Sequence, residues 1–279
     1  MRPRNLSIKP VLRASRHWLL AAALAVAVAL AGGCDDRSDV ISLSTKAKTL
    51  WEAGQYADSA RNFVTLAEIY PGDPLAEESL FWAANLYQHF LSEPDQAIRF
   101  YQHLLVQYAD SVHGIEAREK LGMLYEADET QRHRALQIYQ QLLLNDKAKA
   151  RRDYYQFMIG EINLKMGRLD QARYEFRTLL EKFPNSTHLP EAYYLIGYSY
   201  FLEERFPLAL VAFKQTVKDF PGTPIAERAQ FFIADTLEEK GEFKAALAVF
   251  RSLKNTFHNQ KILDKRIKSL RARMRKGVR

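Results

Sequence analysis

Histidine, cysteine and paired acidic residues could do chemistry in this chain, but their spacing fits no known catalytic or metal-binding motif. The seven histidines are scattered, and none belongs to a His-Glu-x-x-His pair that would put two metal ligands on one helix face. Adjacent acids such as Glu77-Glu78 and Glu203-Glu204 fall in predicted helices or at their ends, and neighbouring residues of a helix do not share a face. The sequence contains no glycine-rich phosphate loop and no Gly-x-Ser-x-Gly elbow. We therefore expect no enzyme activity, no metal, no cofactor and no small-molecule substrate.

Cys34 is the only cysteine, and its surroundings indicate lipid attachment. Five basic residues precede an uncharged stretch from Trp18 to Ala31, and Gly32, Gly33 and Cys34 follow. This order is typical of a secretory signal, and the apolar stretch is short for a membrane span. The segment 30–34 resembles a bacterial lipobox, whose cysteine becomes the acylated first residue; an ordinary cleaved signal with an incidental cysteine is the alternative. A single thiol cannot form an internal disulfide, which favours lipidation.

Basic residues are concentrated at the two ends of the chain. The formal charge of +7 comes from 40 basic and 33 acidic residues. The leader 1–33 has 5 basic residues and no acidic one, and 261–279 has 9 basic residues against Asp264 alone. Between Cys34 and Gln260 there are 26 basic and 32 acidic residues, a net charge of −6. Because the body of the protein is acidic, we expect no nucleic-acid partner.

A pattern of small and aromatic residues occurs six times, at intervals of 37 or 38 residues. A small residue is followed after 12 or 13 positions by a second one, and four positions later by a large aromatic residue. In helical-hairpin repeats the small residues allow two helices to cross closely, and the aromatic ring fills the space beside them. The six triplets are Ala47/Ser59/Phe63, Ala84/Ala97/Tyr101, Gly122/Ala135/Tyr139, Gly160/Ala172/Phe176, Gly197/Ala209/Phe213 and Ala234/Ala246/Phe250.

The pattern predicts an all-α superhelix of about six helical hairpins over residues 44–258. A signal peptide at 1–33 and a polar tether at 34–43 precede it, and a basic capping helix and tail at 259–279 follow. We expect Gly54, Thr130 and Glu204 to lie in tight turns between paired helices, where glycine is favoured but not required. We also expect an irregular junction at 145–152. The last helix, 262–276, has one apolar stripe typical of a cap; its arginines could in addition meet acidic headgroups or an acidic partner.

The first helix of each hairpin is expected to line a concave groove. Positions three before, one after and four after its small residue should face a ligand. In the fifth repeat all three are aromatic, which is typical of a peptide or protein docking site. The alternative is that these rings pack inside the superhelix. The candidate groove residues are Phe81, Asn85, Phe157, Glu161, Tyr194, Tyr198, Phe201 and Phe231.

The repeats resemble the tetratricopeptide family over about residues 44–258. Together with the lipobox and the stretch from Phe183 to Tyr198, they resemble the BamD family of outer-membrane assembly lipoproteins and, as a second choice, the CpoB family of periplasmic cell-division coordinators. The first resemblance implies a lipoprotein on the periplasmic face of the outer membrane that scaffolds β-barrel assembly and binds barrel precursors.

Two alternatives remain open at this level. Asp35, directly after the cysteine, is typical of lipoproteins kept in the inner membrane. The chain could also serve as an adaptor for cell division, peptidoglycan or polysaccharide export machinery. In every case the expected partners are other envelope proteins or peptides, and the expected contact with the membrane is a lipid on Cys34.

Overall fold

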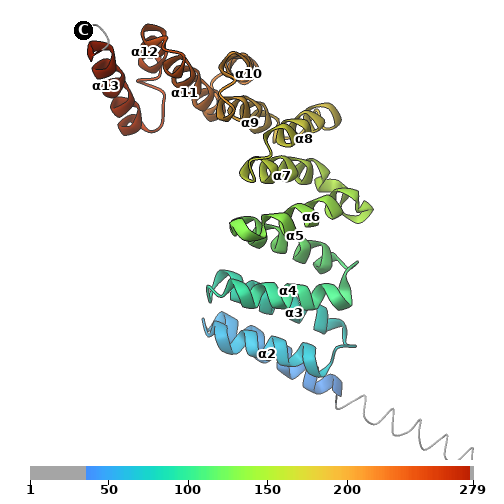
Figure 1. The fold of residues 1–279 in the computed structure, drawn as a ribbon. Coiled ribbons are helices and arrows are strands. Elements are labelled where there is room, and N and C mark those ends of the chain that lie inside the picture. The colour runs from blue at the N-terminus through green and yellow to red at the C-terminus, as the bar shows by residue number, and fades with distance from the viewer. Residues whose placement is uncertain (1–35, 277–279) are drawn as a thin grey trace, which may run out of the picture. The chain divides into compact units, whose positions relative to one another are not determined.

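The computed structural model describes residues 36–276, and every regular element among them is a helix. The residues form two compact units, unit 1 up to His113 and unit 2 from Gly114. Figure 1 shows the helices in chain order. After a helix over residues 36–52 they are α2 (Tyr56–Ile69), α3 (Pro74–His89), α4 (Pro94–Tyr108), α5 (Val112–Ala127), η1 (Glu129–Gln131), α6 (Arg132–Leu144), η2 (Asp146–Arg151), α7 (Arg152–Lys165), α8 (Leu169–Lys182), α9 (Leu189–Leu202), α10 (Phe206–Asp219), α11 (Pro224–Glu239), α12 (Phe243–Ser252) and α13 (Gln260–Lys276).

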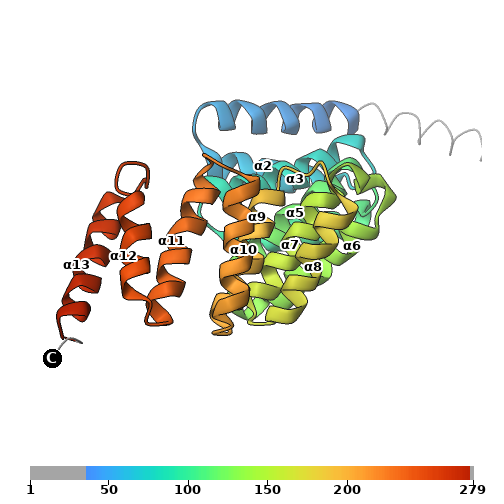
Figure 2. The same cartoon turned by 90° about the horizontal axis from the view of Figure 1, so that it is seen from above.

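Each helix packs against the next one in the chain within its unit. In unit 1, α3 contacts both α2 and α4. In unit 2, each helix from α7 to α12 packs on the next helix in the chain. Figure 2 shows the succession from α9 to α13 from above. Helices α9 and α11 also touch each other directly, because the first helices of neighbouring hairpins lie side by side. The predicted all-α repeat architecture is confirmed.

The small and aromatic residues of the repeat pattern form the joints between paired helices. All of them are buried, and most have no exposed surface. At Gly160, an added Cβ would lie 2.6 Å from Cε1 of Phe176, and at Gly197 it would lie 2.7 Å from Cδ1 of Phe213. Because a carbon atom cannot approach an aromatic ring that closely, the glycines are required for these helix crossings. The interpretation of the pattern as helix-crossing sites is confirmed.

The polar tether predicted for 34–43 is wrong from residue 36 onward, because residues 36–43 are helical. Val40, Ser44 and Ala47 are buried along one face of this helix, so its apolar stripe starts earlier than expected. At its beginning, an Arg37 guanidinium nitrogen lies 2.5 Å from Asp73 Oδ2. The predicted signal peptide and Cys34 lie outside the described residues.

Five of the six predicted turns between paired helices have a residue with left-handed backbone, with φ values between 56° and 78°. These residues are Gly54, Ser92, Gly167, Glu204 and Gly241. Two of these residues, Ser92 and Glu204, are not glycine and therefore adopt a conformation that side chains disfavour. Thr130, in the corresponding position of the third repeat, instead lies in the 3₁₀ turn η1, where its amide donates to Asp128 Oδ1 at 2.9 Å. The expected irregular junction at 145–152 is the 3₁₀ segment η2.

Replacing Glu204 with glycine is expected to raise the free energy of unfolding by roughly 0.5 kcal/mol. Relieving the left-handed strain stabilises the folded chain by more free energy than the extra conformational entropy of glycine contributes to the unfolded chain. Thr130→Gly is the matched change and should lower stability, because it removes a side chain that hydrogen-bonds in its turn. Urea unfolding of the two variants checks this, and two shifts of the same sign would contradict it.

Helix α13 covers the last hairpin as the expected cap. Leu263, Ile267 and Leu270 are buried in a cluster with residues of α11 and α12. Arg273 Nη1 lies 2.5 Å from Glu238 Oε1, and Arg266 is ion-paired with Asp235 and Glu238 of α11. Burial raises the pKa of Asp235 to about 6, although the nearby Arg266 guanidinium opposes this rise.

The contact between α11 and α13 should therefore depend on pH. Asp235 holds its proton more tightly in the folded chain than in the unfolded chain, where its pKa is near the ordinary 3.8. Its contribution to stability is fully present below about pH 4 and is lost as the pH rises through about 6. In Asp235→Asn this loss is absent, so the variant should gain up to about 2 kcal/mol over the wild type between pH 4 and 7. Urea unfolding across this range measures the gain; a constant difference between the two proteins would contradict it.

Candidate protein-binding site

A hollow lined by aromatic rings lies in unit 2, between the first helices of the last two hairpins and the start of α13. Its volume is about 580 Å³. Tyr and Phe side chains make up most of its wall, with Arg228 and His258 as the polar members. The lining residues are Tyr194, Leu195, Tyr198, Arg228, Phe231, Phe232, Phe257, His258 and Ile262.

Phe232 is the centre of the aromatic cluster. Its ring centroid lies 5.2 Å from that of Tyr198, 5.5 Å from Phe201 and 5.7 Å from Tyr194, in each case in an edge-to-face arrangement. Such pairs are favourable beyond the area that they bury, so the cluster holds its members in fixed orientations. Tyr198, Phe201 and Phe232 remain partly exposed. The cluster is therefore a preformed apolar surface rather than a closed core.

Arg228 gives this surface a fixed positive group. Its guanidinium lies 4.4 Å from the ring centroid of Tyr194 and 3.0 Å from Glu191 Oε1. Tyr194 is only 3% exposed, and burial raises its pKa to about 12 against the effect of Arg228. Its hydroxyl therefore stays protonated at neutral pH. On the other side, Phe231 stacks on Phe257 with 4.9 Å between ring centroids.

The structure places four of the eight candidate groove residues in or beside this hollow. Tyr194, Tyr198 and Phe231 line the hollow, and Phe201 contacts the ring of Phe232, which also lines it. Whether these residues contact a ligand stays a prediction.

The other four candidates lie apart from the hollow and have contacts of their own. In unit 1, Phe81 packs on the imidazole of His113, with 4.9 Å between ring centroids, and the Asn85 amide donates to the Phe81 carbonyl. In unit 2, Phe157 stacks on His188 at 4.8 Å, and Glu161 pairs with Lys165 at 3.0 Å. Phe81 and Phe157 are less than 9% exposed, so they serve mainly to pack one repeat against the next.

The sequence reasoning missed Phe232, which lies two positions before the small residue Ala234. This position turns toward the preceding hairpin, where it meets the residue four positions after the preceding small residue, here Phe201. The aromatic residue at the same place in the second repeat, Trp82, could have revealed it. Phe257 and His258 lie in the loop before α13, outside the repeat, so the repeat gave no signal for them.

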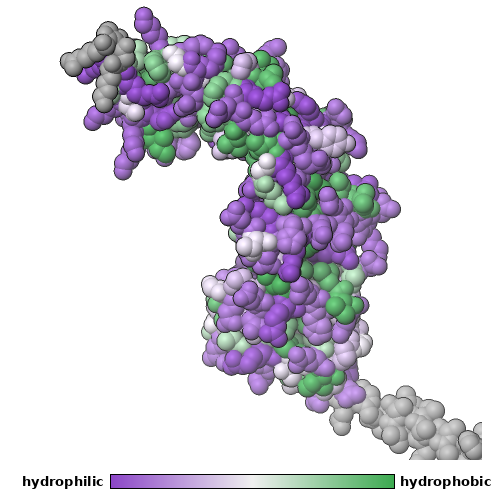
Figure 3. Space-filling view, viewed as in Figure 1, coloured by the Kyte–Doolittle hydropathy of each residue, from purple (hydrophilic) through white to green (hydrophobic). Residues whose placement is uncertain are grey.

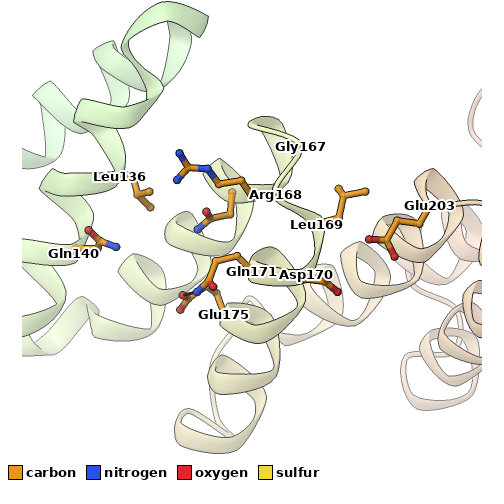
Figure 4. Close-up of a pocket in the computed structure, with 10 residues that line it drawn as sticks. Leu136, Gln140, Gly167, Arg168, Leu169, Asp170, Gln171, Glu175 and Glu203 are labelled. Atoms are coloured by element: carbon orange, nitrogen blue, oxygen red, sulfur yellow. Dashed lines mark hydrogen bonds between the residues drawn. The ribbon is translucent and has the colours of Figure 1, made fainter.

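A second hollow in unit 2, of about 640 Å³, is polar and is shown in Figure 4. Leu136 and Gln140 of α6 lie on one side of it and Glu203 on the other, with α8 between them. Its carboxylates are engaged within the chain: Glu175 accepts from Gln156 Nε2 at 2.6 Å, and Glu203 accepts from Arg173 at 2.9 Å. This arrangement offers no nucleophile beside a base.

The described part of the chain was also searched for metal sites and membrane-spanning helices. Among residues 36–276, His, Cys, Asp and Glu nowhere gather in threes that could hold a metal ion. We also find no helix in this range with the length and hydropathy of a membrane span. The surface in Figure 3 is largely hydrophilic, with hydrophobic residues in small separate areas.

Comparisons with known proteins identify the repeats. Family models described as tetratricopeptide repeat match residues 78–111, 154–186 and 194–256. No curated protein sequence matches the chain. These three segments therefore match tetratricopeptide repeats, which are typical of scaffolds that mediate protein–protein interactions.

Three solved structures illustrate the shared fold. A tetratricopeptide repeat protein from Parabacteroides merdae is 16% identical, with a TM-score of 0.62 over 84% of this chain and 88% of that one. PilW, a type IV pilus biogenesis factor, is 16% identical, with a TM-score of 0.53 over 80% and 97%. YrrB, a repeat protein with an unusual peptide-binding site, is 18% identical, with a TM-score of 0.51 over 71% and 96%. At these identities the likeness concerns the fold alone.

Proposed function

We propose that this protein is a lipid-anchored scaffold of the bacterial cell envelope that binds partner proteins through the aromatic hollow of unit 2. The main support for the binding function is the partly exposed cluster of Tyr198, Phe201 and Phe232 at this hollow. Large aromatic residues on a rigid support are the side chains that most often dominate binding energy at protein interfaces. The polar groups of Arg228 and His258 at the wall would orient the bound segment.

The proposed anchor is a lipid on Cys34, and the proposed location is the periplasmic face of the outer membrane. The basic leader, the apolar stretch and the small residues before Cys34 support this proposal. The described helices begin only two residues after Cys34, so the anchor would hold unit 1 near the membrane surface. The periplasmic face of the inner membrane is the alternative.

The finer role that we propose is BamD-like, as a scaffold in the assembly of outer-membrane β-barrel proteins. Support comes from the combination of lipobox and tetratricopeptide repeats. A second candidate is an adaptor for another envelope process, such as cell division or the peptidoglycan or polysaccharide export machinery, which the tetratricopeptide repeats would serve equally well.

Affinity isolation of the intact lipoprotein from solubilised envelopes tests the scaffold function. The double variant Tyr198→Ala/Phe201→Ala should lose the specific partner, while Tyr174→Ala should retain it. Tyr174 is a suitable control because it is 63% exposed on α8 and does not line the hollow. Circular dichroism melting of both variants verifies that they fold. Partner recovery that is equal from the double variant and the wild type would overturn the assignment of the hollow.

Two further measurements separate the finer claims. Cys34→Ser should move the protein from the membrane fraction to the soluble periplasmic fraction; if it stays with the membrane, the lipid anchor is wrong. Depletion of the protein should lower the amounts of outer-membrane barrel proteins. Unchanged amounts would rule out the BamD-like role and leave the second candidate.

A further inference from the structure

Two partly exposed tryptophans, in contact with each other, line a small apolar pocket in unit 1. Trp51 lies at the end of the helix over residues 36–52 and Trp82 lies on α3, with 5.7 Å between ring centroids. The pocket has a volume of about 210 Å³, and the buried side chains of Phe63 and Leu86 line it below the two indoles. Its volume suits one large apolar side chain, such as leucine, methionine or phenylalanine.

The indoles are exposed although the fold offers a buried environment beside them. Trp51 is 40% and Trp82 36% exposed, whereas Phe63 and Leu86 are nearly inaccessible. The Trp82 Nε1–H already donates to Glu78 Oε1 at 3.1 Å, so this indole presents its ring rather than its polar group. Tryptophan is among the residues most enriched at the energetic centre of protein interfaces. A preformed pocket lined by exposed aromatic rings therefore fits an anchoring side chain of a partner.

The charges around the pocket specify what lies next to that anchoring side chain. Glu52, Glu78 and Lys48 line the pocket. Lys48 Nζ lies 3.7 Å from Glu78 Oε1, whereas Glu52 is exposed and has no ion pair among the described residues. Residues 36–113 contain 5 Lys and Arg against 11 Asp and Glu, a net charge of −6. The exposed faces of the indole rings also attract cations.

We propose that this pocket, which we call the tryptophan pocket, binds a partner protein segment with one large apolar side chain and a Lys or Arg next to it. The apolar side chain lies in the pocket against Phe63, Leu86 and the pair of indoles, and the neighbouring cation lies over the exposed indole faces beside Glu52. The inference goes beyond the proposed function, because this site lies in unit 1 and requires neither the aromatic hollow of unit 2 nor the lipid on Cys34.

The tryptophans of the chain provide a fluorescence signal that tests this proposal. Of its three tryptophans, Trp18 lies in the predicted leader, so a protein that starts at residue 34 has only Trp51 and Trp82. Intrinsic tryptophan fluorescence of that protein, with Cys34→Ser in place of the lipid, then reports on this pocket alone. The probes are three short peptides with blocked ends: a central phenylalanine between lysines, a central phenylalanine between glutamates, and a central serine between lysines.

The lysine-flanked phenylalanine peptide should change the fluorescence in a saturable way. The glutamate-flanked peptide should bind about tenfold more weakly, because it faces an acidic rim. The serine-centred peptide should give no saturable change, because it lacks the anchor. Equal binding of all three peptides, preference for the glutamate-flanked one or no binding of any would each overturn the proposal. So would a fluorescence change with protein concentration alone, which would indicate that a second copy fills the pocket.

A charge reversal at the rim provides the matched control. Glu52→Lys should weaken the binding of the lysine-flanked peptide about tenfold and strengthen the binding of the glutamate-flanked peptide. Glu68→Lys makes the same change of net charge at an exposed position of α2 outside the pocket, and should leave both affinities nearly unchanged. Equal weakening by the two substitutions would show a general effect of charge and would overturn the assignment to Glu52.

Discussion

Replacing Gly160 with alanine is expected to lower the free energy of unfolding by about 2 kcal/mol. In a solvent-exposed helix the same change would raise it by about 1 kcal/mol, because alanine is the better helix former. Here the new Cβ would lie 2.6 Å from Cε1 and 2.7 Å from Cδ1 of Phe176, which is fully buried. The ring or the helix must move to make room, and such overpacking typically costs about 1–3 kcal/mol. Urea unfolding measures the difference.

Two companion variants show whether the clash with Phe176 is the cause. An alanine at Gly72 would have no atom within 4 Å of its Cβ, so Gly72→Ala should change stability little. In a Phe176→Leu background, where the ring is absent, Gly160→Ala should cost much less than in the wild type, because the two residues are in contact. A Gly160→Ala variant as stable as the wild type would show that the crossing of α7 and α8 does not depend on glycine.

Arg173→Leu is expected to lower the free energy of unfolding by about 3 kcal/mol. The Arg173 side chain is 3% exposed, and its guanidinium bonds Glu203 Oε1 at 2.9 Å and Ser199 Oγ at 3.2 Å. It also lies 4.4 Å from the ring centroid of Tyr200, and so ties α8 to α9. Removing one partner of a fully buried ion pair typically costs about 3–5 kcal/mol, and the expected loss lies at the low end because the Glu203 side chain is 24% exposed. Glu203 keeps only Arg205, at 3.6 Å.

The control for Arg173 lies one helical turn further along α8. Arg177 contacts Tyr200 as well, but this contact is exposed to solvent, so Arg177→Leu should cost less than about 1 kcal/mol. If the stranded charge of Glu203 is the cause, Arg173→Leu/Glu203→Leu should recover a large part of the lost stability. Equal losses in the single and double variants would attribute the effect to lost packing instead.

The sequence predicted the helix crossings well because they follow from side-chain size alone. Only a glycine or alanine can lie where an aromatic ring of the paired helix approaches its backbone, as Gly197 does against Phe213. The beginning of the first helix was missed for the opposite reason. Its buried stripe of Val40, Ser44 and Ala47 contains a single large apolar residue, so its polar composition resembled a linker.

The candidate site could be predicted only in part, because a repeat period does not give the rotation of one hairpin against the next. The sequence pointed to the fifth repeat, with Tyr198 and Phe201, but assigned no role to Phe232. In the structure, the residue four positions after one small residue meets the residue two positions before the next. This rule produces both the Phe201–Phe232 contact and the Trp51–Trp82 pair. The two aromatic surfaces are thus equivalent positions of the same repeat.

The proposed binding of partner proteins at the aromatic hollow of unit 2 can be tested in living cells. Photocrosslinking in living cells tests it most directly, with a photoreactive phenylalanine analogue placed at Tyr198 in one strain and at Tyr174 in another. We expect a discrete crosslinked partner protein from position 198, which is lost when Phe201 is also changed to alanine, and none from position 174. The same crosslinks from both positions, or none from position 198 while the protein is folded and present in the envelope, would contradict it.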